Sequence, residues 1–98
     1  MKPVAYHRLA AKELVKTAAF YEERRPRLGD RFLDSVEAVQ EQIRRWPELG
    51  RREPAGAQSL KVKRFPFRVV YLAQPDRFWV VAVAHLSRRP GYWRRRLE

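Results

Sequence analysis

Residues Phe78–His85 most constrain the fold, because their sequence, FWVVAVAH, places seven apolar residues in a row before a histidine. The run is too short to cross a membrane as a helix, which takes about 20 apolar residues. Its β-branched and aromatic side chains favour a strand buried on both faces. A polar block, His85–Trp93, follows it, and a basic block, Leu60–Tyr71, precedes it. We therefore expect this strand to form the floor of the fold and the two blocks to form its working surface.

The N-terminal half predicts a short strand and a helical hairpin. Pro3–Arg8 alternates weakly between apolar and polar residues and suits an edge or joining strand. Helical spacing of apolar residues then predicts a helix over residues 9–25, stopped by Pro26, and a second over 28–46, closed by Pro47. A short turn between two such helices makes them antiparallel neighbours.

Each helix has an expected buried stripe. In the first helix the stripe comprises Ala11, Leu14, Val15, Ala18 and Tyr21, with Lys12, Glu13, Lys16, Glu22 and Glu23 on the opposite side. In the second helix it comprises Leu28, Phe32, Val36, Val39, Ile43 and Trp46. The aromatic residues of the second stripe are interpreted as core.

The C-terminal half predicts an antiparallel meander. A loop over residues 48–59 precedes strands at 60–64, 67–72 and 78–85. Helices on one face of this sheet give a two-layer α+β fold in a single domain spanning residues 1–98. The other face has no helical cover, so Lys61, Lys63 and Arg68 are expected to project there.

Charge indicates a polyanionic partner. The chain carries a net charge of +11, of which residues 1–49 contribute +2 and residues 50–98 contribute +9. Such asymmetry favours a nucleic-acid-facing half, with an anionic membrane surface or an acidic protein as alternatives. The absence of cysteine excludes disulfides and a thiolate site and fits a cytoplasmic protein, as does the lack of a signal peptide at the start of the sequence.

Several segments, taken in order, resemble the RelE/ParE superfamily of toxins from bacterial type II toxin–antitoxin modules. Phe20–Tyr21 and Leu28–Phe32 are similar to its helical hairpin, and Phe65–Tyr71 is similar to its central strand. Val83–His85 and Arg88–Trp93 resemble its C-terminal signature. The resemblance implies an acidic antitoxin that holds the toxin inactive in a hetero-oligomer. It also implies one of two targets: RelE-like members cut mRNA on the ribosome, whereas ParE-like members poison DNA gyrase.

The ribonuclease hypothesis, which we place slightly ahead, needs a base, an acid and cations around a phosphate. Lys61 and Lys63, two apart on one strand, are expected to share a face as phosphate-binding cations or an acid–base pair. The resemblance implies that Arg68 clamps the scissile phosphate. It also implies that Arg88, or else Arg89, matches an arginine after the last strand. Tyr92 matches a tyrosine that stacks on a base or transfers a proton, and His85 is the natural group to titrate near neutral pH.

Each candidate also has a purely structural interpretation. Lysines on an alternating strand commonly form a solvated face, Arg68 could pair with Glu53, and Trp93 could pack the tail on the sheet. Glu53 is a further candidate base, and Arg94–Arg96 could contact either phosphate or the antitoxin. We expect no cofactor and no metal, since no phosphate-binding glycine loop or metal-ligand cluster is present. A non-catalytic basic binding protein remains a third hypothesis.

Overall fold

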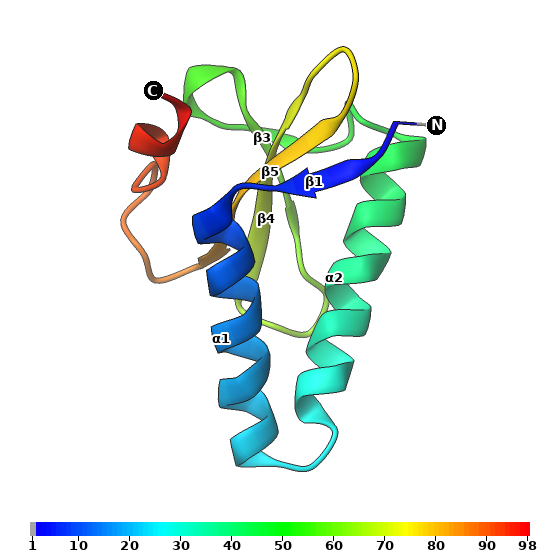
Figure 1. Ribbon diagram of the computed structural model, residues 1–98, viewed down its shortest axis with the longest axis vertical. Helices are drawn as coiled ribbons and strands as arrows, with labels where there is room; N and C mark the ends of the chain where they lie inside the picture. The colour runs from blue at the N-terminus through cyan, green and yellow to red at the C-terminus, as the bar shows by residue number, and fades with distance from the viewer. Residues whose placement is uncertain (1) are drawn as a thin grey trace.

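A computed structural model describes residues 2–98 as one mixed sheet with two helices against one face (Figure 1). The strands lie in the order β1-β5-β4-β3-β2, with β1 parallel to β5 and the other pairs antiparallel. The elements are β1 (Val4–Tyr6), α1 (Arg8–Arg24), α2 (Leu28–Arg45), β2 (Arg51–Arg52), the 3₁₀ turn η1 (Pro54–Gly56), β3 (Gln58–Lys61), β4 (Phe67–Ala73), β5 (Phe78–His85) and the 3₁₀ turn η2 (Arg94–Leu97). This arrangement confirms the predicted α+β fold and meander.

Strand β5 is an interior strand of the sheet and is buried on both faces, as its composition predicts. It lies between β1 and β4, and Val80–Val83 are each at most 2% exposed. Val70 pairs with Ala82 while Tyr71 pairs with Val80, so Val81 is a bulge residue without a direct partner. The bulge shifts the alternation of side chains, which brings Val80 and Val83 to the same face, against the helices.

The helical hairpin buries one stripe of each helix, and both predicted stripes contain errors. In α1 the core residues are Ala10, Leu14, Ala18 and Tyr21. Of the predicted residues, Val15 is 67% exposed and Ala11 is only partly buried, whereas the fully buried Ala10 was not predicted. In α2 the predicted residues are buried up to Ile43, but Trp46 is 56% exposed because the helix ends at Arg45 and the chain turns away there.

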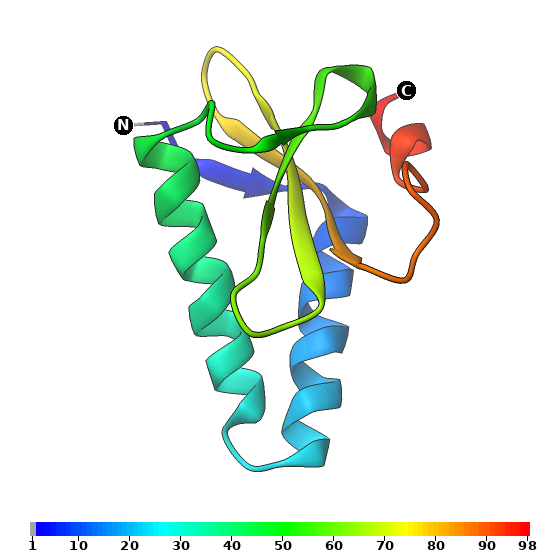
Figure 2. The same cartoon turned by 180° about the vertical axis from the view of Figure 1, so that it is seen from behind.

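The face of the sheet away from the helices is not bare, which corrects the expectation of an uncovered surface. Trp93 is 2% exposed and packs with Val70, Val81 and Ala82 on this face. Figure 2 shows the C-terminal residues, in orange and red, at the rim of the sheet beside the loop that precedes β3. The chain therefore covers part of this face with its own tail and leaves a smaller hollow beside it.

The segment predicted as an exposed loop over residues 48–59 contains additional structure. Arg51–Arg52 form β2, which pairs with β3, and the 3₁₀ turn η1 connects the two strands. Ser59 is consequently fully buried in β3 rather than exposed. Over residues 2–98 no helix has the length and apolar character needed to span a membrane.

Candidate functional site

A basic hollow of about 100 Å³ lies between the sheet and the segment after β5, and we call it the arginine hollow. Four arginines and one carboxylate contribute to its walls: Arg51, Arg68, Arg88, Arg89 and Glu53. The aromatic residues Tyr92 and Trp93 complete it. Two of its arginines come from strands and two from the loop after β5, so it joins the two basic blocks of the sequence.

Strand register fixes Arg68 at the base of this hollow. Its Nε donates to Ser59 Oγ at 2.8 Å, and its Nη2 donates to the Ser59 carbonyl at 3.2 Å. Burial lowers the pKa of Arg68, and the nearby charge of Arg51 lowers it further. The guanidinium stays protonated at neutral pH. Two cations are thus held near each other, and with one carboxylate against four arginines the hollow keeps an excess of positive charge, which favours the binding of an anion.

Glu53 closes a network with the same arginines. Its Oε2 accepts from Ser59 Oγ at 2.6 Å and from Arg51 Nη2 at 2.9 Å. Burial acts to raise the pKa of Glu53, but hydrogen bonds from Ser59 and Arg51 outweigh it and the pKa is lowered. A carboxylate with a lowered pKa and its lone pairs already engaged is a poor general base at neutral pH.

Arg88 and Tyr92 form the opposite wall. The Arg88 guanidinium carbon lies 3.7 Å from the centroid of the Tyr92 ring, which is a cation–π contact. The Tyr92 hydroxyl donates to Glu13 Oε2 at 2.6 Å. Burial raises the pKa of Tyr92, and the hydrogen bond and charge of Glu13 raise it further. Tyr92 therefore stays neutral and presents its ring, rather than its hydroxyl, to Arg88.

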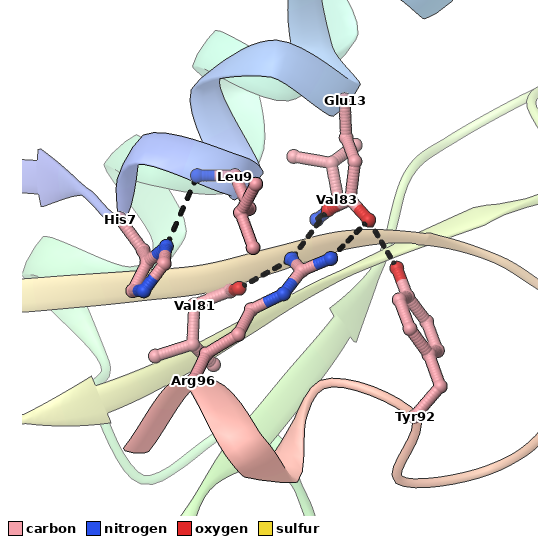
Figure 3. Close-up of polar contacts among 7 residues, drawn as sticks. All are labelled: His7, Leu9, Glu13, Val81, Val83, Tyr92 and Arg96. Carbon is pink, nitrogen blue, oxygen red and sulfur yellow. Dashed lines mark hydrogen bonds and ion pairs between the residues drawn. The ribbon is translucent and has the colours of Figure 1, made fainter. Parts of the chain in front are cut away.

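Glu13 of α1 is the residue that the sequence did not single out, and it organises this wall (Figure 3). Besides Tyr92, its carboxylate accepts from Arg96 Nη1 and Nη2 at 2.9 and 2.8 Å and from the Val83 amide at 3.0 Å. Arg96 Nη1 also donates to the Val81 carbonyl at 2.9 Å. Strand β1 pairs with β5 only as far as Val80. Beyond that point, Glu13 and Arg96 provide the hydrogen-bond partners of the β5 backbone that a neighbouring strand would provide. The pattern of charged residues in helix α1 does not distinguish Glu13 from the solvent-exposed charges around it, so the sequence alone does not predict these contacts.

The same contacts correct the interpretation of the C-terminal arginines. Arg94 and Arg95 are exposed, but Arg96 is partly buried and paired with Glu13 inside the fold. Hydrogen bonding to Glu13 raises the pKa of Arg96 despite its burial. Arg96 therefore holds the tail in place and is not available for a phosphate or an antitoxin.

Lys61 and Lys63 do not share a strand face, contrary to the prediction. Strand β3 ends at Lys61, and Lys63 lies exposed in the turn before β4. Lys61 Nζ donates to the carbonyls of Val62 and Phe65 at 2.8 and 2.6 Å, which ties down that turn. Neither lysine lines the arginine hollow.

The imidazole of His85 lies on the helix side of the sheet, not beside Arg68. His85 pairs with Phe67, and the two rings are 4.9 Å apart at 80°, whereas Arg68 pairs with Ala84 on the opposite face. Its Nδ1 accepts from the Ser87 amide at 2.9 Å. The bulge in β5 causes this placement, because it shifts the alternation by one residue. No group of three or more potential metal ligands is found over residues 2–98.

The structure thus brings four of the six predicted site residues to one hollow and leaves two apart. Arg68, Arg88 and Tyr92 line the arginine hollow, and His85 borders it, although the His85 ring packs against Phe67 on the helix side. Lys61 and Lys63 lie outside it. The assembled side chains are mainly arginines and an aromatic ring, and the carboxylate among them, Glu53, already accepts from Arg51 and Ser59. The arrangement is suited to holding an anion.

A family model matches most of the chain. The sequence model described as ParE toxin of type II toxin-antitoxin system, parDE, matches residues 4–90. The chain belongs to this ParE toxin family. The match spans every helix and strand except η2. Arg68 and Arg88 lie inside it, whereas Tyr92 and Arg96 lie beyond its end.

Known structures agree with the ParE fold. A chain of the chromosomal ParDE toxin–antitoxin system from P. aeruginosa superimposes with a TM-score of 0.62 at 20% sequence identity. The alignment covers 87% of this chain and 96% of that one. Comparison with curated protein sequences gives no match.

Proposed function

We propose that this ParE-family toxin acts on DNA gyrase and not as a ribonuclease. Membership of the ParE family supports gyrase as the target, because the resemblance described above implies that ParE-like members poison that enzyme. The observation that carries the choice is the dispersal of the proton-transfer groups expected of a ribonuclease. Lys61 donates to the carbonyls of the β3–β4 turn, and the His85 ring packs against Phe67 on the face of the sheet opposite to Arg68. The order of the two hypotheses drawn from the sequence is therefore reversed.

The arginine hollow is the surface we assign to the target. Arg68 is held by Ser59 and Arg88 is held against Tyr92, so both cations are oriented before a partner arrives. Preorganised cations lose little side-chain entropy on binding. Their common ligand is a carboxylate or a phosphate, either of which a complex of gyrase with DNA supplies.

An acidic antitoxin is the proposed inhibitor, with which the toxin forms a hetero-oligomer. The net charge of +11 supports an acidic partner, and the P. aeruginosa structure is of a toxin–antitoxin system. Electrostatic attraction of this kind speeds association and weakens with added salt.

Induced expression with two parallel readouts tests the target. We expect gyrase poisoning to give protein-linked double-strand breaks in plasmid DNA, while primer extension shows intact transcripts. Overexpression of a drug-resistant or altered gyrase should change the fraction of cells that survive induction of the toxin. Intact plasmid together with ribosome-dependent transcript cuts would reject the gyrase assignment.

Ribosome-dependent mRNA cleavage remains the second candidate, because Arg68, Arg88 and Tyr92 do line a single hollow. A metal-independent endoribonuclease of this kind would lose its transcript cuts in Arg68→Gln. The absence of both breaks and cuts, with growth unaffected, would leave the third candidate, a non-catalytic basic binding protein.

A further inference from the structure

A second basic surface lies between the first turns of helix α2 and the β3–β4 turn. The α1–α2 turn and the β3–β4 turn together border a hollow of about 430 Å³, which we call the tip hollow. Figure 2 shows the β3–β4 turn crossing in front of the helical hairpin. The cations that line it are Arg25, Arg31 and Arg64, and its apolar lining is Leu28 and Phe65. None of these residues belongs to the arginine hollow.

The three arginines of the tip hollow have no ionic partner among residues 2–98. The ion pairs of that part of the chain involve Arg44, Arg51 and Arg96. Asp34 lines the tip hollow but forms no ion pair within 4.0 Å. The hollow thus holds three cations and one carboxylate, an excess of positive charge that the fold itself does not use.

Backbone geometry adds an independent observation. Arg64, in the β3–β4 turn, has a φ of 72°, and Arg27, in the α1–α2 turn, also has a φ of 72°. Glycine adopts this left-handed region without strain, whereas other residues lose about 1 kcal/mol there. Lys61 holds the β3–β4 turn in place through two carbonyls, so Arg64 is fixed in this conformation. Because this conformation costs stability and Arg64 forms no ion pair among residues 2–98, its side chain is a candidate for a contact outside the fold.

The amides at the start of α2 are not part of the site. Glu22 already accepts from the Arg27 and Gly29 amides at 2.9 and 3.1 Å. A ligand in the tip hollow therefore meets guanidinium groups, which match the geometry of a phosphate better than a lysine does.

We infer that the tip hollow binds the sugar–phosphate backbone of a nucleic acid. A regularly charged polymer suits arginines drawn from the α1–α2 turn, helix α2 and the β3–β4 turn, since neighbouring phosphates can reach different guanidinium groups. An acidic protein is the weaker alternative, because protein interfaces have an apolar centre and none of the large exposed apolar residues lines this hollow. The inference does not depend on gyrase being the target, since the contact is a property of the isolated toxin.

Binding of labelled nucleic acid to the purified toxin, measured by fluorescence anisotropy at several salt concentrations, tests this site. The probes are a DNA duplex and a single-stranded RNA of equal length. In the variant Arg25→Gln/Arg31→Gln/Arg64→Gly we expect affinity to fall roughly 10- to 100-fold at low salt. The slope of log affinity against log salt should fall by about two to three. Loss on one probe only identifies which nucleic acid the tip binds.

Two matched variants separate this effect from net charge and from strain. Arg8→Gln/Lys12→Gln/Arg45→Gln removes the same charge from exposed positions outside the tip hollow and should keep most of the affinity. Ala55→Gly relieves another left-handed residue, with a φ of 61°, without changing charge. It should raise the melting temperature as Arg64→Gly does and leave binding unchanged.

Two results would overturn the inference. The tip variant could bind both probes as tightly as the wild type, or lose no more affinity than the charge-matched variant. If the variant keeps nucleic-acid binding and a parallel assay shows that it no longer binds the antitoxin, the tip hollow is a protein-binding surface. Because gyrase is absent from this assay, its outcome is independent of the target proposed above.

Discussion

Glu13 and Arg96, 83 residues apart in the chain, form an ion pair with Nη2 2.8 Å from Oε2. Both side chains are largely buried, at 18% and 12% exposure. The pair lies where β1 ends and β5 continues, and it supplies the acceptor for the Val83 amide and the donor for the Val81 carbonyl. A salt bridge thus takes the place of a strand partner and fixes the C-terminal tail to the sheet.

Substitution Glu13→Gln should destabilise the fold by about 2 kcal/mol, because it leaves the guanidinium of Arg96 largely buried without its counter-charge. The amide oxygen of glutamine can still accept from Val83, so the loss isolates the ionic part. Denaturant unfolding gives the free energy. Hydrogen exchange should show faster opening of the η2 segment than in the wild type.

Glu41→Gln, which removes the exposed pair with Arg44, should change stability by less than about 0.5 kcal/mol. Equal effects of the two changes would contradict this interpretation.

Stability should fall in acid, and Glu13 should account for part of the loss. The folded-state pKa of Glu13 is lowered from its ordinary value of 4.5: burial opposes this, but hydrogen bonds from Arg96, Tyr92 and Val83 prevail. The pKa of Glu53 is lowered in the same way. A lowered carboxyl pKa contributes stability that is present above 4.5 and is lost as pH falls through the folded-state value. Unfolding free energies measured from pH 7 to pH 3 should therefore decline less steeply in Glu13→Gln than in the wild type. Parallel curves would show that Glu13 titrates normally.

Trp93 should anchor the tail by burial. It is 2% exposed against Val70, Val81 and Ala82, so Trp93→Ala should cost about 3 kcal/mol. Trp46→Ala is the matched change, because that indole is 56% exposed, and its effect should stay below about 1 kcal/mol. Thermal unfolding of the two variants measures the difference, and similar melting temperatures would exclude an anchoring role.

The sequence predicted those features that depend on local pattern. The apolar run of β5 indicated a doubly buried strand, and the spacing from Phe32 to Ile43 indicated the buried stripe of α2. The face of His85 could not be predicted, because counting alternate residues from Phe78 ignores the bulge at Val81. Glu13 was missed for a different reason. Its partner Arg96 is distant in sequence, and helical periodicity places a charged residue in solvent by default.

Gly29 should be required for the close approach of the two helices. A Cβ at this position would lie 2.5 Å from the backbone carbonyl oxygen of Ala18. Alanine normally stabilises a helix by about 1 kcal/mol relative to glycine, so propensity alone predicts a gain for Gly29→Ala. The clash with a backbone atom cannot be relieved by a rotamer change, and we expect a net loss of about 2 kcal/mol. Denaturant unfolding measures the sign, and a gain in stability would show that the hairpin can separate without loss.

Substitutions of Arg68 and of Lys63 by glutamine should differ in their effect on toxicity, although each removes one positive charge. Arg68 lies at the base of the arginine hollow, oriented by Ser59, while Lys63 is exposed in a turn outside that hollow. Loss of an oriented guanidinium that contacts an anion costs about 2 kcal/mol, which corresponds to about 30-fold in target affinity. Arg68→Gln should therefore require far higher induction to arrest growth, whereas Lys63→Gln should match the wild type.

Unfolding curves of both variants check that Arg68→Gln remains folded at the growth temperature. Arg68→Lys should recover only part of the activity, since an ammonium cannot donate to Ser59 and to a ligand in the same geometry. Full activity of Arg68→Gln would remove the arginine hollow from the toxic mechanism.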